Sequence, residues 1–463
     1  MIYKINESFV LRNIGTVWIV VDIHTNKLYE LNDTAAEIFR LFQKSISKKE
    51  IVDVLSRMYD QEKSVICHDL ESLIDSFMQI GILSSLTDNE EKKNGSRAVI
   101  SARHFDYYVR NIWNNIKHPY KVKSFELTPR CNFWCYHCYQ GELKRFGKAM
   151  TTKEIKQIID KMLEIGVLEI VLTGGEPLIR QDFKDIYTYA KQRGLLVRLF
   201  TNGTLIDDSL ISLFKEYPPE KLIVSIYGMS EETYKKTTHR NGMFDVVMRN
   251  LDKISQSYIP FSIKFIVSKI TLSDFDSVCR YAIEKKAELR YAFYIYPSND
   301  NDQSVCDYMI DVKDMLYFDI QYQSAFNKNV AKKKNNWLAF YRKNGFVPQF
   351  LCDFPHNQFY IDFTGQVFAC SAGMKSIGGN IIIDDFNEIW KRFLDVRKIP
   401  MKSLNECVSC DALYYCVNCP SDEYSFYGDA ELINKKVCLF AKAKKLYYSD
   451  HYSYEEIVQK LRL

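Results

Sequence analysis

The sequence predicts an α/β fold in which a partial barrel of six βα units lies between a small α+β block and a cysteine-rich block. Three observations predict it. Strand-like segments alternate with segments of helical periodicity from about residue 120 to residue 300. A polar stretch without periodicity, residues 86–99, separates this region from an N-terminal block. The thirteen cysteines are spaced unevenly, and most fall into two groups.

The composition excludes several classes of protein. With 47% hydrophobic and 14% aromatic residues, the chain of 463 residues is not predominantly disordered and suffices for several domains. A net charge of +4 without a long basic tract argues against nucleic acid as a partner. No window approaches about 18 uninterrupted apolar residues, and the N-terminus lacks a signal peptide's features. We therefore predict a cytoplasmic protein without a membrane partner.

The N-terminal block, residues 1–85, is predicted to begin with strands at 16–22 and 27–32, joined by a turn at 24–26. Three helical segments follow at 33–43, 48–59 and 69–80. Gly81 stands where a helix C-cap is expected. This order predicts a compact domain of its own.

The central region is predicted to contain six parallel strands, because each strand-like segment is followed by a helical one. These strands are expected at 124–128, 169–173, 197–201, 222–227, 262–267 and 290–296. Six units curve more naturally into an open partial barrel than into a closed one, and chemistry is then expected at the carboxyl ends of the strands. Residues 300–345 are predicted to be helical, and a final helix at 439–446 precedes a tail to residue 463.

The first cysteine group, Cys131, Cys135 and Cys138, directly follows the first barrel strand with the spacing CxxxCxxC. Three cysteines bound to a [4Fe–4S] cluster leave one iron open for another ligand. The alternative is a zinc site, but structural zinc takes four ligands, and His137 is too close in sequence to complete this one easily. The isolated Cys67, Cys279 and Cys306 are predicted to be small buried hydrophobic residues.

With these cysteines, the strand-end segments resemble the radical S-adenosylmethionine (SAM) superfamily. The segment Thr173-Gly174-Gly175-Glu176-Pro177 resembles its GGE motif, and residues 201–204 and 225–228 resemble segments that contact SAM. The resemblance implies a SAM-binding [4Fe–4S] cluster on the three cysteines and a 5′-deoxyadenosyl radical that abstracts hydrogen. The residues that it assigns to SAM are His137, Gly174, Gly175, Glu176, Pro177, Thr201, Asn202, Ser225 and Arg240.

The second cysteine group resembles the seven-cysteine SPASM pattern. Its members are Cys352, Cys370, Cys407, Cys410, Cys416, Cys419 and Cys438. Two residues separate Cys416 from Cys419, where the general pattern has three. The resemblance implies two auxiliary [4Fe–4S] clusters. One is held by Cys407, Cys410, Cys416 and Cys438, and the other by Cys352, Cys370 and Cys419, with an open iron unless a non-cysteine group fills the fourth position. The rival is a zinc ribbon of Cys407, Cys410, Cys416 and Cys419, which leaves three cysteines unexplained.

The N-terminal block resembles the PqqD-like recognition element of enzymes that modify ribosomally synthesised peptides (RiPPs). Residues 27–36 and the closing Gly81-Ile82-Leu83 carry this resemblance. It implies that a leader peptide adds a strand beside residues 28–31 and packs against the helix at 69–80. The alternative is a winged-helix-like or purely structural domain.

Together these resemblances predict a radical SAM maturase that binds a precursor peptide and installs thioether crosslinks, as in sactipeptides and ranthipeptides. The expected parts are a recognition element (1–85), a linker (86–118), a radical SAM partial barrel (119–340), a SPASM domain (341–440) and a C-terminal helix and tail (441–463). Three [4Fe–4S] clusters, SAM and an electron donor such as flavodoxin or ferredoxin are implied. Alternatives are another peptide modification, such as a carbon–carbon crosslink, and a zinc-stabilised peptide-binding protein without catalysis.

Overall fold

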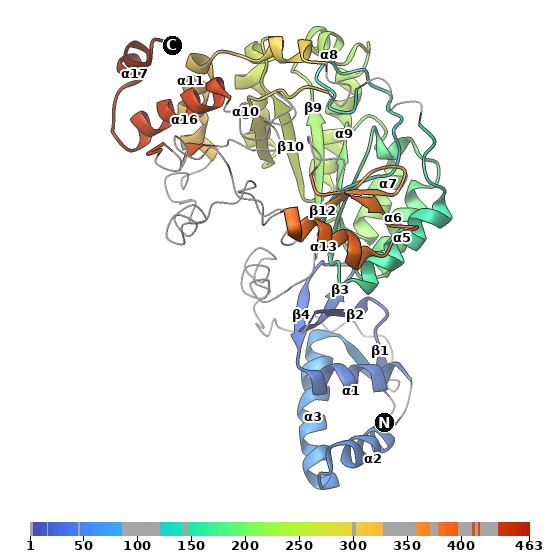
Figure 1. Cartoon of the computed structure of the whole chain (residues 1–463). Helices are drawn as coiled ribbons and strands as arrows, with labels where there is room; N and C mark the ends of the chain where they lie inside the picture. Colours follow the sequence, from blue (N-terminus) through green and yellow to red (C-terminus); the bar gives the residue numbers. More distant parts are fainter. Residues whose placement is uncertain are drawn as a thin grey trace.

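The computed structural model describes most of the chain, and Figure 1 shows its course. The described residues are 3–15, 17–44, 47–85, 121–141, 147–298, 302–326, 358–370, 378–396, 410–412, 415–416 and 434–463. The predicted linker at 86–118 lies outside them. None of the described helices is long and apolar enough to cross a membrane.

The N-terminal domain combines two small antiparallel sheets with three helices (Figure 1). Its elements are β1 (Tyr3–Ile5), β2 (Phe9–Ile14), β3 (Val17–Asp22), β4 (Leu28–Leu31), α1 (Asp33–Gln43), α2 (Lys48–Tyr59), α3 (Lys63–Ile80) and β5 (Leu83–Ser85). One sheet has the order β2-β3-β4, so β4 is an edge strand, and the other pairs β1 with β5. The predicted hairpin and three helices are confirmed, whereas β1, β2 and β5 were not predicted.

Local capping explains where these helices begin and end. Ser47 and Glu50 form a capping box at the start of α2, and Gly81 ends α3 with a left-handed φ of 88°. Helix α3 begins six residues before the predicted segment, at Lys63. Its N-cap residue, Glu62, makes no side-chain capping hydrogen bond, so the sequence carries no start signal there.

The central sheet is an open, curved sheet whose six barrel strands are parallel, in the order β11-β10-β9-β8-β7-β6. These strands are β6 (Lys121–Glu126), β7 (Glu169–Thr173), β8 (Leu196–Thr201), β9 (Lys221–Ile226), β10 (Phe261–Ile266) and β11 (Glu288–Ala292). The helices are α5 (Thr152–Glu164), α6 (Phe183–Gln192), α7 (Asp208–Glu216), α8 (Glu231–Thr238), α9 (Phe244–Gln256), α10 (Phe275–Glu284) and α11 (Val312–Phe326). The predicted partial barrel of six βα units is thereby confirmed.

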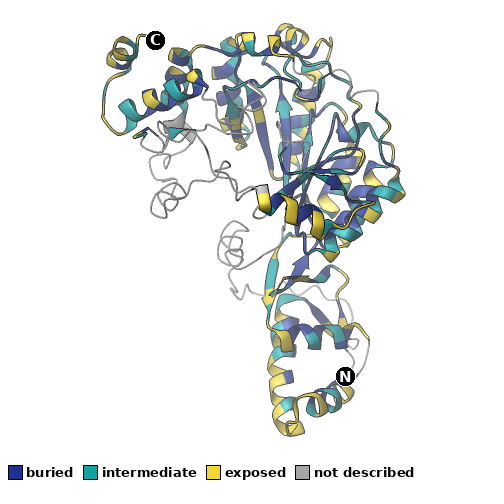
Figure 2. Cartoon of the chain, in the orientation of Figure 1, coloured by how far each residue is buried: buried dark blue, intermediate teal, exposed yellow. Residues whose placement is uncertain are grey.

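The largest core lies between the sheet and the helices along its outer face (Figure 2). Alternate strand residues such as Ile263 and Phe265 point into it. Helix α5 buries Ile155, Ile158 and Ile159 on one face, as its periodicity predicted. The remaining strand residues point to the inner face of the sheet.

The C-terminal region extends this sheet, which the sequence did not indicate. Its elements are β12 (Gln358–Ile361), β13 (Gln366–Phe368), β14 (Gly379–Asn380), α13 (Phe386–Val396), α16 (Lys435–Tyr448) and α17 (Tyr454–Leu461). Strand β12 pairs with β6 in parallel, and β13 and β14 follow antiparallel. The predicted final helix is confirmed as part of the longer α16, and the predicted tail contains α17.

The N-terminal domain is seated at the amino ends of the barrel strands, opposite the cysteine loop. Arg12 is buried there, and its guanidinium donates to the carbonyl oxygens of Val167 at 3.0 Å and Arg193 at 3.3 Å. Burial lowers the pKa of Arg12 to about 10. A small apolar cluster joins β2 and β3 to Leu168 and Leu196 of the barrel. These contacts fix the edge strand β4 relative to the barrel.

Candidate active site

The cysteine loop begins a few residues after β6 and is held by backbone hydrogen bonds that it donates to helix α8. Trp134 donates its N–H to the carbonyl of Thr238 at 2.9 Å, and Tyr136 donates to that of Thr237 at 3.2 Å. Cys131, Cys135 and Cys138 are all half-buried and form no disulfide. The N–H of Phe133 points at the sulfur of Cys131 at 3.4 Å, a contact that favours a thiolate there.

The three cysteines suit a cluster better than a single ion. Within the ranges that the structure describes, no three His, Cys, Asp or Glu side chains come close enough to hold one metal ion. A [4Fe–4S] cluster binds its three cysteines on different irons, so they need not meet at one point. The half-buried thiols and the N–H contact to Cys131 are therefore compatible with such a cluster.

Gly174 and Gly175 let the loop after β7 lie directly against the loop after β6. Gly175 donates its N–H to the carbonyl of Thr128 at 2.7 Å, and Glu176 donates to that of Arg130 at 2.8 Å. A Cβ on Gly175 would lie 2.2 Å from the Arg130 carbonyl oxygen, and Gly174 has a φ of 140°. The two glycines are thus required by contact between these loops, whatever ligand they also approach.

Replacing Gly175 by alanine should force these two loops apart. We expect the barrel to be destabilised by about 2–4 kcal/mol, because the carbonyl that the new Cβ meets is backbone and cannot swing away. Thermal unfolding of the full chain measures this. The matched control is Gly242→Ala, where φ is 72° but nothing lies within 4 Å of the added Cβ, so only the backbone conformation is penalised. Equal losses in both variants would contradict the close contact.

The Glu176 carboxylate ties the end of β7 to the end of β8. It accepts hydrogen bonds from the Thr201 hydroxyl at 2.8 Å, the Asn202 N–H at 2.7 Å and the Leu178 N–H at 3.1 Å. The last of these caps a short 3₁₀ turn that begins at Pro177. Burial raises the pKa of Glu176 to about 7, in spite of these three donors.

Asn132 connects the cysteine loop to two other predicted site residues. Its side-chain oxygen accepts from the Asn202 amide at 2.8 Å, and its backbone oxygen accepts from the Arg240 guanidinium at 2.9 Å. The Asn202 amide nitrogen also lies 4.0 Å from the Cys131 sulfur. Cys131, Glu176, Thr201, Asn202 and Arg240 therefore belong to one connected group. Sequence analysis missed Asn132, although it stands directly beside the first cysteine.

His137 lies inside the site with its ring between those of Tyr136 and Tyr227. Its Nδ1 is buried and has no hydrogen-bond partner among the described residues. Burial, and secondarily the charge of Lys264, lower the pKa of His137 to about 4, so the imidazole is neutral at physiological pH. Ser225 lies on β9, is half-buried, and has no hydrogen bond to this group among the described residues.

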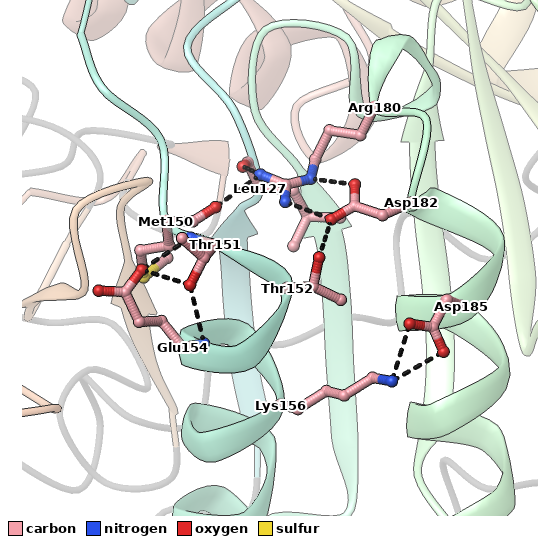
Figure 3. A network of polar contacts seen from close by, with 9 residues as sticks. All are labelled: Leu127, Met150, Thr151, Thr152, Glu154, Lys156, Arg180, Asp182 and Asp185. Carbon is pink, nitrogen blue, oxygen red and sulfur yellow. Dashed lines mark hydrogen bonds and ion pairs between the residues drawn. The ribbon is translucent and has the colours of Figure 1, made fainter.

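Arg180 is a further residue that sequence analysis missed, and Figure 3 shows its contacts. Its guanidinium donates to the carbonyl oxygens of Leu127 and Met150, both at 2.9 Å, and pairs with Asp182 at 2.6 Å. It therefore fixes the loop after β7 to the segment after β6 and to the chain entering α5. The only signal in the sequence is an arginine that closely follows the GGE segment.

The second cysteine group is described only in part. Cys370, Cys410, Cys416 and Cys438 are half-buried, whereas Cys352, Cys407 and Cys419 lie outside the described residues. Cys438 is on α16, and Cys370 follows β13, beside the barrel. Of the isolated cysteines, Cys279 is buried as predicted, while Cys67 and Cys306 are only half-buried.

Family models match two parts of the chain. Residues 125–282 match the radical SAM superfamily, and residues 18–83 match coenzyme PQQ synthesis protein D (PqqD). Among curated relatives, the AdoMet-dependent heme synthase of Methanosarcina barkeri is 27% identical and covers 70% of this chain and 98% of its own length. The mycofactocin maturase MftC of Mycolicibacterium smegmatis is 26% identical, with 63% of this chain and 76% of its own length covered.

Solved structures share the fold at low sequence identity. SuiB of Streptococcus suis, bound to its precursor peptide SuiA, has a TM-score of 0.57 and 15% identity, covering 94% of this chain and 99% of that one. The enzyme anSMEcpe with bound AdoMet has a TM-score of 0.55 and 17% identity, covering 74% and 95%. These findings confirm the predicted radical SAM fold with an N-terminal PqqD-like domain.

Proposed function

Because the chain joins a radical SAM domain to a PqqD-like domain, we propose that it is a peptide maturase that binds a ribosomal precursor and modifies it by radical chemistry. The single observation that carries the proposal is the attachment of β4, an edge strand among the described residues, to a barrel with three cysteines at the opposite strand ends. Membership of the radical SAM superfamily implies a [4Fe–4S] cluster and SAM binding.

The loops at the carboxyl ends of the strands carry the residues proposed to hold these groups. Cys131, Cys135 and Cys138 would bind the cluster, and the backbone of Gly174 and Gly175 with the Glu176 carboxylate would receive the SAM amino group. When bound, the clusters and SAM supply the one-electron chemistry, namely a 5′-deoxyadenosyl radical that removes a hydrogen atom and an acceptor for the electron released on bond formation. The proposed SAM site also includes the neutral His137, Thr201, Asn202, Ser225 and Arg240.

SAM affinity should fall as pH is lowered through about 7. The Glu176 carboxylate must be ionised to accept a hydrogen bond from the SAM ammonium, and its pKa is raised to about 7. Below that pH, SAM can bind only if Glu176 first loses its proton, which costs free energy. We expect about a tenfold loss of affinity per pH unit, measured by calorimetry on the anaerobically reconstituted full chain. Glu176→Gln should bind SAM weakly and without this dependence.

The control for this pH profile is Glu154→Gln, on the exposed start of α5. Its carboxylate accepts the Thr151 N–H at 2.7 Å and its pKa is lowered by that bond, so it stays ionised across the range tested. A SAM affinity of the wild type that stays flat between pH 6 and 8 would remove Glu176 from this role.

The leader peptide is proposed to pair with the free edge of β4. Asp22 donates its N–H to the carbonyl of Lys27 at 2.9 Å, and hydrogen-bonded pairs alternate along an antiparallel ladder. Leu28 and Glu30 therefore direct their own N–H and C=O groups away from β3, toward a strand that can be added. A cavity of about 480 Å³, lined by residues 24–28 and by barrel residues such as Pro218 and Ile259, adjoins the start of this edge.

The finer reaction proposed is thioether formation, in which a substrate cysteine bonds to a carbon from which hydrogen was removed. The second cysteine group supports it, since auxiliary clusters on Cys407, Cys410, Cys416 and Cys438 and on Cys352, Cys370 and Cys419 provide an electron acceptor. An electron donor such as flavodoxin or ferredoxin supplies the first electron. The domain limits proposed are 1–85, 86–118, 119–340, 341–440 and 441–463.

The test is mass spectrometry of the precursor peptide encoded beside the gene, after anaerobic incubation with reduced enzyme and SAM. Loss of the mass of two hydrogens per modification, together with loss of cysteine alkylation, would support a thioether. The same mass loss with every thiol still alkylated would point to a carbon–carbon crosslink. Zinc without iron or sulfide in the anaerobically purified protein would contradict the enzyme proposal altogether.

A further inference from the structure

The inner face of the barrel sheet carries a row of polar residues beside the cysteine loop. In the strand registers, Ser225 of β9 lies opposite Lys264 of β10, and Lys264 lies opposite Arg290 of β11. Ile263 and Phe265, on either side of Lys264, point into the outer core, so strand alternation directs Lys264 to the inner face. Register partners share a face, so all three residues project inward side by side.

This row brings two cations together, and Lys264 is the one that has no anion paired with it among the described residues. Lys264 and Arg290 occupy directly paired positions, an arrangement that is unfavourable for like charges. Arg290 pairs with Glu288 at 2.8 Å. For Lys264 the structure records no ion pair within the described part of the chain, and its ammonium lies 5.5 Å from the centre of the Phe200 ring.

Three acids that the structure describes on the inner face already have partners other than Lys264. Buried Glu169 is paired with Lys121 and lies 3.3 Å from Arg198. Glu288 pairs with Lys221 as well as with Arg290. Glu126, at the end of β6, accepts a hydrogen bond from the Tyr139 hydroxyl at 2.9 Å.

Another lysine, Lys123 of β6, increases the positive charge of this face. For Lys123, as for Lys264, no ion pair is recorded among the described residues. Burial, and then the charge of Lys121, lower the pKa of Lys123, while the charge of Glu169 acts in the opposite direction. Lys123 thus adds a further positive charge beside Lys121.

Lys264 is both accessible and close to the reactive centre. Its side chain is exposed to solvent, yet the surrounding protein, and then Arg290, lower its pKa. Its ammonium lies over the ring of Phe200, which directly precedes Thr201 of the candidate site. Its register partner Ser225 is another predicted site residue, so Lys264 adjoins the active site.

We propose that Lys264, with Arg290 beside it, binds a carboxylate of the peptide substrate at the active site. This inference rests on the proposed function and adds the chemical class that the site selects: a peptide with an aspartate, a glutamate or its own C-terminal carboxylate next to the modified residue. A carboxylate between the two cations relieves their repulsion and forms charge-assisted hydrogen bonds with both. Neither residue is required to touch SAM or the cluster.

The experiment compares Lys264→Met with Lys264→Arg and with Lys153→Met in the reconstituted full-length enzyme. Lys153 is an exposed lysine on α5, remote from the inner face, and serves as the control. We expect Lys264→Met to raise the KM for the precursor about ten- to a hundredfold. SAM affinity and deoxyadenosine formation without peptide should stay unchanged. Lys264→Arg should restore most of the peptide KM, and Lys153→Met should match the wild type.

The second arm varies the charge of the substrate. One set of precursors has a single core Asp or Glu replaced by its amide, and another precursor has an amidated C-terminus. With the wild-type enzyme, one of these peptides should show the same rise in KM that Lys264→Met causes with the unmodified precursor. That peptide should lose nothing further with Lys264→Met, since both changes remove the same contact. Weakened SAM binding by Lys264→Met would overturn the proposal, because the carboxylate would then be that of SAM. An unchanged precursor KM would overturn it too, whereas no modification by wild-type enzyme would instead defeat the proposed function.

Discussion

Replacing Cys131, Cys135 and Cys138 together by alanine is expected to reduce SAM cleavage to background. These thiols are the proposed ligands of the cluster that cleaves SAM, and no other cysteine lies on that loop. The iron and sulfide content should fall by the equivalent of one cluster, while the visible absorption of the auxiliary clusters persists. Binding of the precursor, measured by fluorescence anisotropy, should be unchanged because β4 lies at the opposite end of the barrel.

The matched control is Cys279→Ala, which removes a thiol from the same domain. Cys279 is buried in the outer core, and burial raises its pKa to about 12, so it remains a protonated, apolar side chain. The Cys279→Ala variant should keep the iron content and the SAM cleavage of the wild type. Residual SAM cleavage by the triple variant at more than a small fraction of the wild-type rate would refute the assignment of these three cysteines.

Glu30→Pro is expected to abolish precursor binding while leaving SAM cleavage intact. Proline removes the one outward N–H of Glu30 but none of the hydrogen bonds between β3 and β4, because Glu30 occupies a non-bonded pair of that ladder. Loss of this bond and the steric bulk of the ring should weaken leader binding by about a hundredfold or more. Anisotropy of a labelled precursor measures the affinity, and deoxyadenosine formation without peptide reports on the barrel.

Glu30→Ala is the control for this variant, since it removes the exposed carboxylate and keeps the backbone N–H. It should bind the precursor as the wild type does. Unchanged affinity of Glu30→Pro would show that the leader does not pair with β4.

These point variants separate the two functions more cleanly than removal of residues 1–85. That deletion should weaken precursor binding and leave uncoupled SAM cleavage, but it also strips Arg12 from the barrel carbonyls and uncovers Leu168 and Leu196. The deletion is therefore expected to lower the stability of the barrel as well. A lower rate of SAM cleavage by the deletion variant would then not distinguish lost peptide binding from a destabilised barrel.

The local structure of the barrel was predictable because it is specified by short-range patterns. The predicted strand at 169–173 coincides with β7, and Ile155, Ile158 and Ile159 of α5 have the spacing i, i+3 and i+4 that predicts a helix there. The cysteine spacing and the paired glycines likewise identified the two loops of the site. Such signals are carried by residues a few positions apart, so no tertiary contact is needed to detect them.

What the sequence alone determined is the set of reactive residues: three cysteines after the first strand, a glycine pair and Glu176 after the second, and an N-terminal block of PqqD type. Only the tertiary structure decided that Arg12 seats that block at the far end of the barrel, that Arg180 and Asn132 join the site loops, and that Lys264 stands beside Arg290. The physical reason is that each of these contacts joins residues far apart along the chain. Their meeting depends on strand register and on the packing of the core, which no local pattern records.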